Sequence, residues 1–151
     1  MQVQVHQRIA ARADAVFGIV GDFTQAARWT GVAACTVEGR GIGARRTVTF
    51  TDPARGRVVE RLVALDPERR TLSWRLDHAE PAWPVRDYVA TVRVVPVLAD
   101  VCRLEWGGRF EPGNQPELAI RAWLEELYQA MIDDVRRAVG DCVPPRPGRR
   151  P

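Results

Sequence analysis

Glu60 and Arg61 stand side by side in the middle of an apolar stretch, RVVERLVALD, at residues 57–66. The Val and Leu residues indicate a β-strand, in which neighbouring side chains point to opposite faces. If one face of the sheet is buried, either the carboxylate or the guanidinium points inward. Both faces of this strand carry apolar residues, so alternation alone does not decide between the two. A buried carboxylate resists ionisation unless it is paired, and it can act as a general acid or base or anchor a ligand.

Arg46 and Tyr88 are the other polar side chains that can do chemistry from within predicted strands. Arg46 shares its side of the segment RTVTF with Val48 and Phe50. It can hold an acidic group of a ligand or pair with Glu60, and the alternative is an exposed arginine. A tyrosine hydroxyl needs a partner when it is buried, so Tyr88 contacts either a ligand or a group of the core.

Composition excludes several classes of function. All 22 basic residues are arginine, the net charge is +3, and the arginines are scattered among acids rather than gathered in a basic stripe, so no nucleic-acid partner is expected. The three cysteines have no CxxC spacing, and no cluster has metal-ligand spacing, so we expect reduced thiols, no metal and no cofactor. No signal peptide and no membrane-spanning run is seen, which predicts a cytoplasmic protein without membrane insertion.

The elements that must position these side chains begin with an alternating, half-buried strand at residues 2–10. A short helix is expected at 15–22 with Asp14 as its cap, and a second one ends at Trp29. Six strand segments follow, at residues 32–38, 44–51, 56–65, 70–76, 86–97 and 100–111.

From Pro116 the apolar period becomes helical for about 23 residues, and Gly140 can end this helix. Short turns between consecutive strands predict an antiparallel sheet, and the apolar face of the helix must pack on it. The chain is therefore expected to be a single α+β domain over residues 1–141, followed by a disordered tail rich in Pro and Arg at 142–151.

Four segments resemble the START/Bet v 1-like superfamily, which includes polyketide cyclase/dehydrase and lipid-transport proteins. These are ADAVFGIVGDFTQAARW, GIGARR, ERLVALDPERRTLSWRL and CRLEWGGRFEPGN. The segments follow the order and spacing of that superfamily, and the resemblance spans about residues 3–140, nearly the whole chain. The resemblance implies a helix-grip fold, in which a curved antiparallel sheet of about seven strands surrounds the long C-terminal helix, with two short helices after the first strand. It also implies an internal cavity for a small hydrophobic ligand.

The family pattern places Glu60 in the cavity wall and Arg61 in solvent. It also implies an apolar wall, for which plain core packing is the alternative reading. The expected wall residues are Val48, Phe50, Val58, Leu62, Trp74, Leu76, Ala90, Leu104 and Trp106 on the strands, and Trp123, Leu127 and Met131 on the long helix.

The segment HAEPAWPV, residues 78–85, is expected to be a loop because it carries two prolines. Trp83 lies between these prolines, where it either closes the cavity mouth as part of a lid or packs onto the sheet edge.

Three hypotheses for function remain open. The first is a cavity protein for a polyketide, aromatic metabolite or lipid, which as a cyclase/aromatase would use Glu60, Arg46 and Tyr88 as catalytic residues. The second is a non-catalytic carrier or sensor with a lid at 78–85. The third is an interaction protein whose cavity is filled by tryptophans. Both a monomer and a homodimer are compatible with the sequence.

Overall fold

The computed structural model of the chain describes residues 1–141. The predicted tail at 142–151 lies outside the described residues. The elements are β1 (Gln2–Ile9), α1 (Ala13–Val20), the 3-10 helix η1 (Phe23–Arg28), β2 (Val32–Glu38), β3 (Arg45–Phe50), β4 (Arg57–Asp66), β5 (Thr71–Glu80), β6 (Val85–Leu98), β7 (Val101–Pro112) and α2 (Glu117–Val139).

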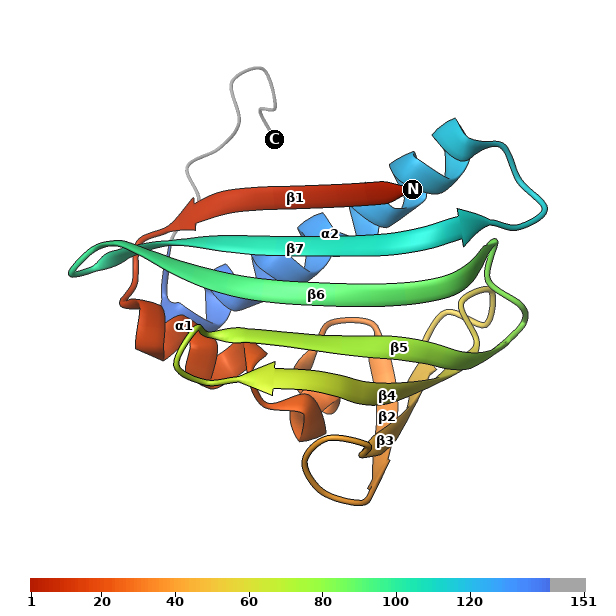
Figure 1. The fold of residues 1–151 in the computed structure, drawn as a ribbon, viewed down its shortest axis with the longest axis horizontal. Coiled ribbons are helices and arrows are strands. Elements are labelled where there is room, and N and C mark those ends of the chain that lie inside the picture. Colours follow the sequence, from red (N-terminus) through yellow and green to blue (C-terminus); the bar gives the residue numbers. More distant parts are fainter. Residues whose placement is uncertain (142–151) are drawn as a thin grey trace.

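The strands form a seven-stranded antiparallel sheet in the order β1-β7-β6-β5-β4-β3-β2. Figure 1 shows this sheet curving around α2, which runs behind β7 and β6 and meets α1 near its C-terminal end. The order of elements, the antiparallel sheet and the long final helix confirm the predicted α+β fold class.

The helices end for recognisable reasons, and one predicted cap is wrong. α2 spans 23 residues and stops at Gly140, whose φ of 75° is the left-handed conformation that glycine adopts without strain. Asp22 caps η1 by accepting a hydrogen bond from the Thr24 amide at 3.0 Å. α1 begins at Ala13, one residue before the expected cap, so Asp14 lies in its first turn and pairs with Arg70 at 2.8 Å.

The core lies between the inner face of the sheet and the helices. Ile120, Leu124 and Ile132 are fully buried on the sheet-facing side of α2. Burying each of these side chains contributes roughly 1.5–3 kcal/mol. This packing against the strands stabilises α2 more than its intrinsic helix propensity does.

Two β-bulges end the pairing between β5 and β6. Val59 pairs with His78 while Glu60 pairs with Leu76, so Asp77 is an extra residue on β5. On β6, two residues, Asp87 and Tyr88, lie opposite a single residue of β7. Bulges bend strands locally. Within the described residues, the β5–β6 ladder covers 71–75 and 89–93 and stops there.

The segment predicted as a loop at 78–85 is shorter than expected. β5 continues to Glu80 and β6 starts at Val85, so the connecting loop is residues 81–84. The two prolines interrupt pairing as expected, but residues 78–80 pair with β4 on their other edge, and this keeps them extended.

Candidate functional site

A cavity lies between the sheet and α2, and most of its wall is apolar. Its volume is about 50 Å³ for the centres of water-sized molecules, where a single water needs roughly 10–15 Å³ by that measure. The lining residues are Ala26, Trp29, Val32, Arg46, Val48, Phe50, Glu60, Trp74, Trp83, Tyr88, Trp106, Leu127, Tyr128 and Met131.

Glu60 is the inward-facing member of the Glu60–Arg61 pair. It is 7% exposed, whereas Arg61 turns to the outer face and binds Asp77. Arg46 pairs with Glu60 in the β3–β4 ladder, and its Nε atom donates to Glu60 Oε1 at 2.9 Å. This neutralises the carboxylate inside the apolar wall, as a buried charge requires.

The Arg46 guanidinium is held on several sides. Its Nη1 atom donates to the Phe23 carbonyl at 3.0 Å. Its central carbon lies 4.2 Å from the centroid of the Phe23 ring and 4.9 Å from that of Trp74, which are cation–π distances. The pair uses Oε1 of Glu60, and no hydrogen bond to Oε2 is found within the described residues.

Tyr88 and Tyr128 form a second polar group in the cavity wall. Their hydroxyl oxygens are 2.6 Å apart and joined by a hydrogen bond. Burial raises the pKa of Tyr88 well above its ordinary value, with the nearby Tyr128 adding to the effect. Burial likewise raises the pKa of Tyr128, against a smaller opposing effect of the Tyr88 hydrogen bond. Both hydroxyls are accordingly neutral across the physiological range.

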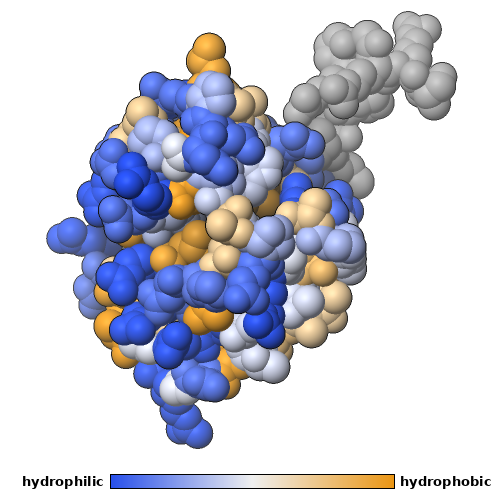
Figure 2. Space-filling view, turned by 90° about the vertical axis from the view of Figure 1, so that its right-hand side faces the viewer, coloured by the Kyte–Doolittle hydropathy of each residue, from blue (hydrophilic) through white to orange (hydrophobic). Residues whose placement is uncertain are grey.

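Trp83 separates the cavity from an open hollow on the outside of the molecule. Its ring packs edge-on against Trp123, with centroids 4.9 Å apart, and near Phe50 and Tyr88. Trp83 and Tyr88 line both the cavity and the outer hollow, which lies where β5 and β6 diverge. Figure 2 shows this end of the molecule, with apolar side chains in the middle of a hydrophilic surface.

The structure places ten of the sixteen predicted site residues around the cavity and the other six beside it. The alternation of a strand predicts which residues point to the inner face of the sheet. Whether such a residue lines a cavity or packs in the core depends on how closely the helices cover it. The six that do not line the cavity are Val58, Leu62, Leu76, Ala90, Leu104 and Trp123. Of these, Leu62, Ala90 and Leu104 are packed in the main core, Val58 is buried in a smaller cluster, and Leu76 and Trp123 pack at their edges.

Four lining residues were missed by the sequence analysis: Ala26, Trp29, Val32 and Tyr128. Tyr128 follows Leu124 by four residues, so the helical period could have found it on the buried face of α2. Ala26 lies in η1 and Trp29 directly follows it, where no period can be extrapolated, and Val32 is the first residue of β2, beside a register shift that interrupts the alternation.

Neither a metal centre nor a membrane span is found in the described part of the chain. Residues 1–141 contain no group of three or more His, Cys, Asp or Glu side chains arranged to hold a metal ion. No helix in this range is long and apolar enough to cross a membrane.

The curved sheet, the gripped helix and the cavity between them define a helix-grip protein. The sequence matches the family described as polyketide cyclase / dehydrase and lipid transport over residues 1–140. The chain therefore belongs to this family. A search of curated proteins finds no match.

Several solved structures share the fold. An uncharacterised protein from Bacillus thuringiensis is 19% identical with a TM-score of 0.82, and the match covers 93% of this chain and all of the other. A START superfamily protein from Mycobacterium smegmatis is 14% identical with a TM-score of 0.77, covering 92% and 97%. A norcoclaurine synthase from Thalictrum flavum, solved with a transition-state analogue, is 22% identical with a TM-score of 0.73, covering 93% and 94%. At such identities these likenesses show the fold alone.

Proposed function

We propose that the protein binds a small, mostly apolar molecule in the cavity between the sheet and α2. The observation that carries this proposal is the combination of an apolar wall with a buried, neutralised Glu60–Arg46 pair. Ligand pockets typically have such a wall and a few placed polar groups, because the wall supplies affinity and the polar groups fix orientation.

An aromatic or polyketide-like molecule fits this wall better than a long acyl chain does. The ring of Trp106 packs edge-to-face against Trp29 and against Trp74, with centroids 6.0 Å apart in both pairs. Aromatic ligands gain from such edges. The available space is small beside the roughly 300–1,000 Å³ of typical ligand pockets, so a larger ligand has to displace aromatic side chains on binding.

Native mass spectrometry of the purified protein tests binding directly, since a retained molecule adds its mass to the folded protein. As a matched pair, Met131→Trp fills the cavity, whereas Leu118→Trp adds the same ring at a position of α2 that is 81% exposed. We expect the first variant to lose the retained molecule and the second to keep it. If both variants keep it, the ligand lies elsewhere and the proposal is wrong.

A catalytic form of this function is a cyclase/aromatase. In that reaction Arg46 would polarise a carbonyl, while Glu60 and Tyr88 would move protons. The presence of carboxylate and hydroxyl groups in one cavity wall favours it. Glu60→Gln tests it with a linear poly-β-ketone: loss of cyclised product with binding retained supports a catalytic Glu60. Product formation at the wild-type rate removes Glu60 from the mechanism.

A non-catalytic carrier or sensor is favoured by a different observation, the position of Trp83 between the cavity and the outer hollow. In this function the loop 81–84 opens to admit the ligand and closes over it. Trp83→Ala should then speed both association and release, measured by stopped-flow tryptophan fluorescence. Unchanged rates would show that access does not pass Trp83.

A further inference from the structure

The chain contains two tyrosines, and the fold brings their hydroxyl groups together. Tyr88 enters from the bulge of β6 and Tyr128 from the middle of α2, 40 residues apart, and their oxygens lie at 2.6 Å. Two hydroxyls carry two protons, and the hydrogen bond between them uses one. Among residues 1–141, the second proton has no acceptor.

That unused proton is costly unless something in the cavity accepts it. Tyr88 is 3% exposed and Tyr128 is 1% exposed. A buried donor without a partner costs about 1–3 kcal/mol. Both tyrosines line the cavity, and most of the neighbouring wall is apolar. Glu60 lines the same cavity and its charge acts on Tyr88, but no hydrogen bond joins it to either hydroxyl in residues 1–141, which leaves the occupant of the cavity as the acceptor to be tested.

The two tyrosine side chains fit closely against β7 because the residue beneath them is a glycine. Gly108 of β7 lies under both rings, and a Cβ atom there would collide with the Tyr128 hydroxyl and lie 2.8 Å from Tyr88 Cε2. The backbone is extended at this position, so glycine is needed for space rather than for its conformation. The two hydroxyls thus occupy a recess that any larger residue would fill.

We infer that the ligand of the cavity is a neutral apolar molecule with a carbonyl oxygen, and that the Tyr88–Tyr128 pair binds this oxygen. This inference rests on the proposed binding function. A carbonyl oxygen accepts the single spare proton without needing to donate one. A ligand carboxylate fits less well, because Glu60 already neutralises Arg46 and a second buried anion would have no counter-charge.

Because either tyrosine hydroxyl can donate to the ligand, single and double tyrosine-to-phenylalanine variants should behave differently. If Tyr128 loses its hydroxyl, Tyr88 keeps one proton that it can donate to the ligand, and the reverse holds for Tyr88→Phe. Preference for a carbonyl should survive each single variant and be lost in the double variant. Replacing both partners by apolar groups of the same shape is nearly neutral for stability, so the double variant is expected to fold.

The test uses acetophenone and its isostere α-methylstyrene, in which a methylene group replaces the carbonyl oxygen. Dissociation constants for both probes are measured by protein NMR titration. Relative to wild type, Tyr88→Phe/Tyr128→Phe should shift the ratio of the two constants against acetophenone by about tenfold, the effect of one lost hydrogen bond. Each single variant should shift it by less than about threefold.

A direct readout comes from tyrosine labelled with ¹³C at Cζ, because the protein has two such carbons. Acetophenone should shift at least one Cζ signal and α-methylstyrene should leave both nearly unchanged. Thr91→Val is the matched control, since it removes a hydroxyl that bonds Ser73 on the outer face, at 2.8 Å. Its ratio of constants should equal that of the wild type.

The outcomes separate this inference from the function on which it rests. If both probes bind but the ratio is unchanged in the double variant and the Cζ signals stay still, the tyrosine pair does not bind the carbonyl and the inference is overturned. A trapped water would then be the acceptor, while the binding function stands. If neither probe perturbs the indole signals of the cavity tryptophans, the binding function fails, and the inference fails with it.

Discussion

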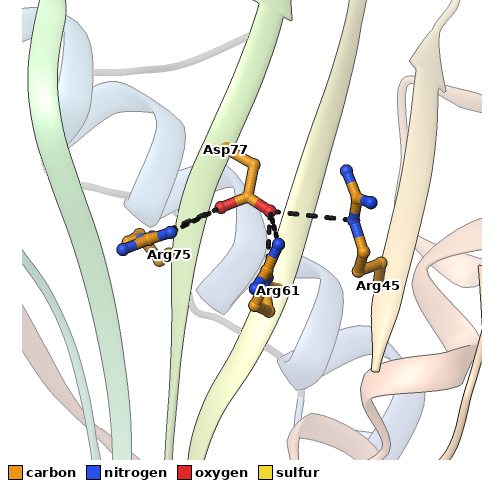
Figure 3. A network of polar contacts seen from close by, with 4 residues as sticks. All are labelled: Arg45, Arg61, Arg75 and Asp77. Carbon is orange, nitrogen blue, oxygen red and sulfur yellow. Dashed lines mark hydrogen bonds and ion pairs between the residues drawn. The ribbon is translucent and has the colours of Figure 1, made fainter. Parts of the chain in front are cut away.

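Glu60 and Asp77 lie on neighbouring strands but on opposite faces of the sheet, and their surroundings differ in kind. Glu60 faces the cavity and binds one arginine, Arg46, so the inner pair is neutral. Asp77 lies on the outer face, where Arg61 and Arg75 bind it at 3.0 and 3.2 Å, and Arg45 at 3.7 Å. Figure 3 shows these three arginines converging on the single carboxylate.

The difference follows from the bulge in β5. Glu60 pairs with Leu76, and the extra residue Asp77 turns its side chain to the outer face together with His78. There, three arginine side chains that are 41–53% exposed share one acceptor, which leaves an excess of positive charge. The Asp77 side chain is itself only 11% exposed, but its arginines reach water, which tolerates the excess charge. The inner face tolerates only a balanced pair, because each unpaired charge there would be desolvated.

Breaking the inner pair should have the largest effect. Arg46→Met leaves the Glu60 carboxylate buried without its partner, which is expected to lower the free energy of unfolding by about 3–5 kcal/mol. Urea denaturation measures this. The double variant Arg46→Met/Glu60→Leu removes both charges and should recover most of the loss. If the double variant is no more stable than Arg46→Met, the cost comes from lost packing on Phe23 and Trp74 and not from an uncompensated charge.

The inner tyrosines should make the protein sensitive to alkali. Their pKa values are raised in the folded state, so the unfolded chain releases these protons first, at about pH 10. Their contribution is fully present below that pH and is lost as the pH rises above it, by roughly 2–3 kcal/mol at about pH 11 for the two groups. Denaturation of wild type and Tyr88→Phe/Tyr128→Phe at a series of pH values measures it.

The difference between these two proteins isolates the tyrosines. Burial also raises the pKa of Cys35 and Cys102, but both cysteines remain in the double variant. The chain has no lysine to titrate in this range. Equal alkaline slopes for the two proteins would show that the hydroxyls are not protected in the folded state.

Two adjacent glycines of β7 repeat the contrast between faces. Gly108→Ala places a methyl group against Tyr128 and Tyr88 on the inner face, which should cost about 1–3 kcal/mol by overpacking. Gly107→Ala points outward, where its nearest contact is the Val3 carbonyl at 3.1 Å, and should cost less. Thermal unfolding compares them, and an equal or larger loss for Gly107→Ala would contradict the crowding assigned to the inner recess.

The sequence predicted the elements well because their patterns are periodic. The alternation of β4 and the helical stripe from Pro116 to Gly140 report burial directly. The inward position of Glu60 needed the family resemblance, since both faces of β4 carry apolar residues. Tyr128 was missed although it lies on the buried stripe of α2, because its neighbour Leu127 already satisfied the period.

The sequence did not predict the two β-bulges at which the inward–outward alternation of side chains along β5 and β6 is interrupted. Asp77 and the Asp87–Tyr88 bulge have no local signature, and both depend on how β4 and β7 pair with their neighbours. These bulges end the β5–β6 ladder, place Asp77 outside and aim Tyr88 inward. Residues 78–80, predicted as part of a loop, are extended strand because they pair with β4.

The outer network should respond least when it is broken. Asp77→Asn removes the acceptor shared by three half-exposed arginines. The Asp77 side chain is only 11% exposed, but its loss leaves behind charges that water can solvate, so the cost is expected to be at most about 1 kcal/mol. The loss should shrink as NaCl rises from about 0.05 to 1 M, since the Debye length falls from roughly 14 to 3 Å. Arg46→Met, measured in the same series, should keep most of its cost, because its partner is buried. A salt-independent loss above about 2 kcal/mol for Asp77→Asn would mean that the outer arginines need their partner as much as the buried Glu60 needs Arg46, and the contrast between the two faces would fail.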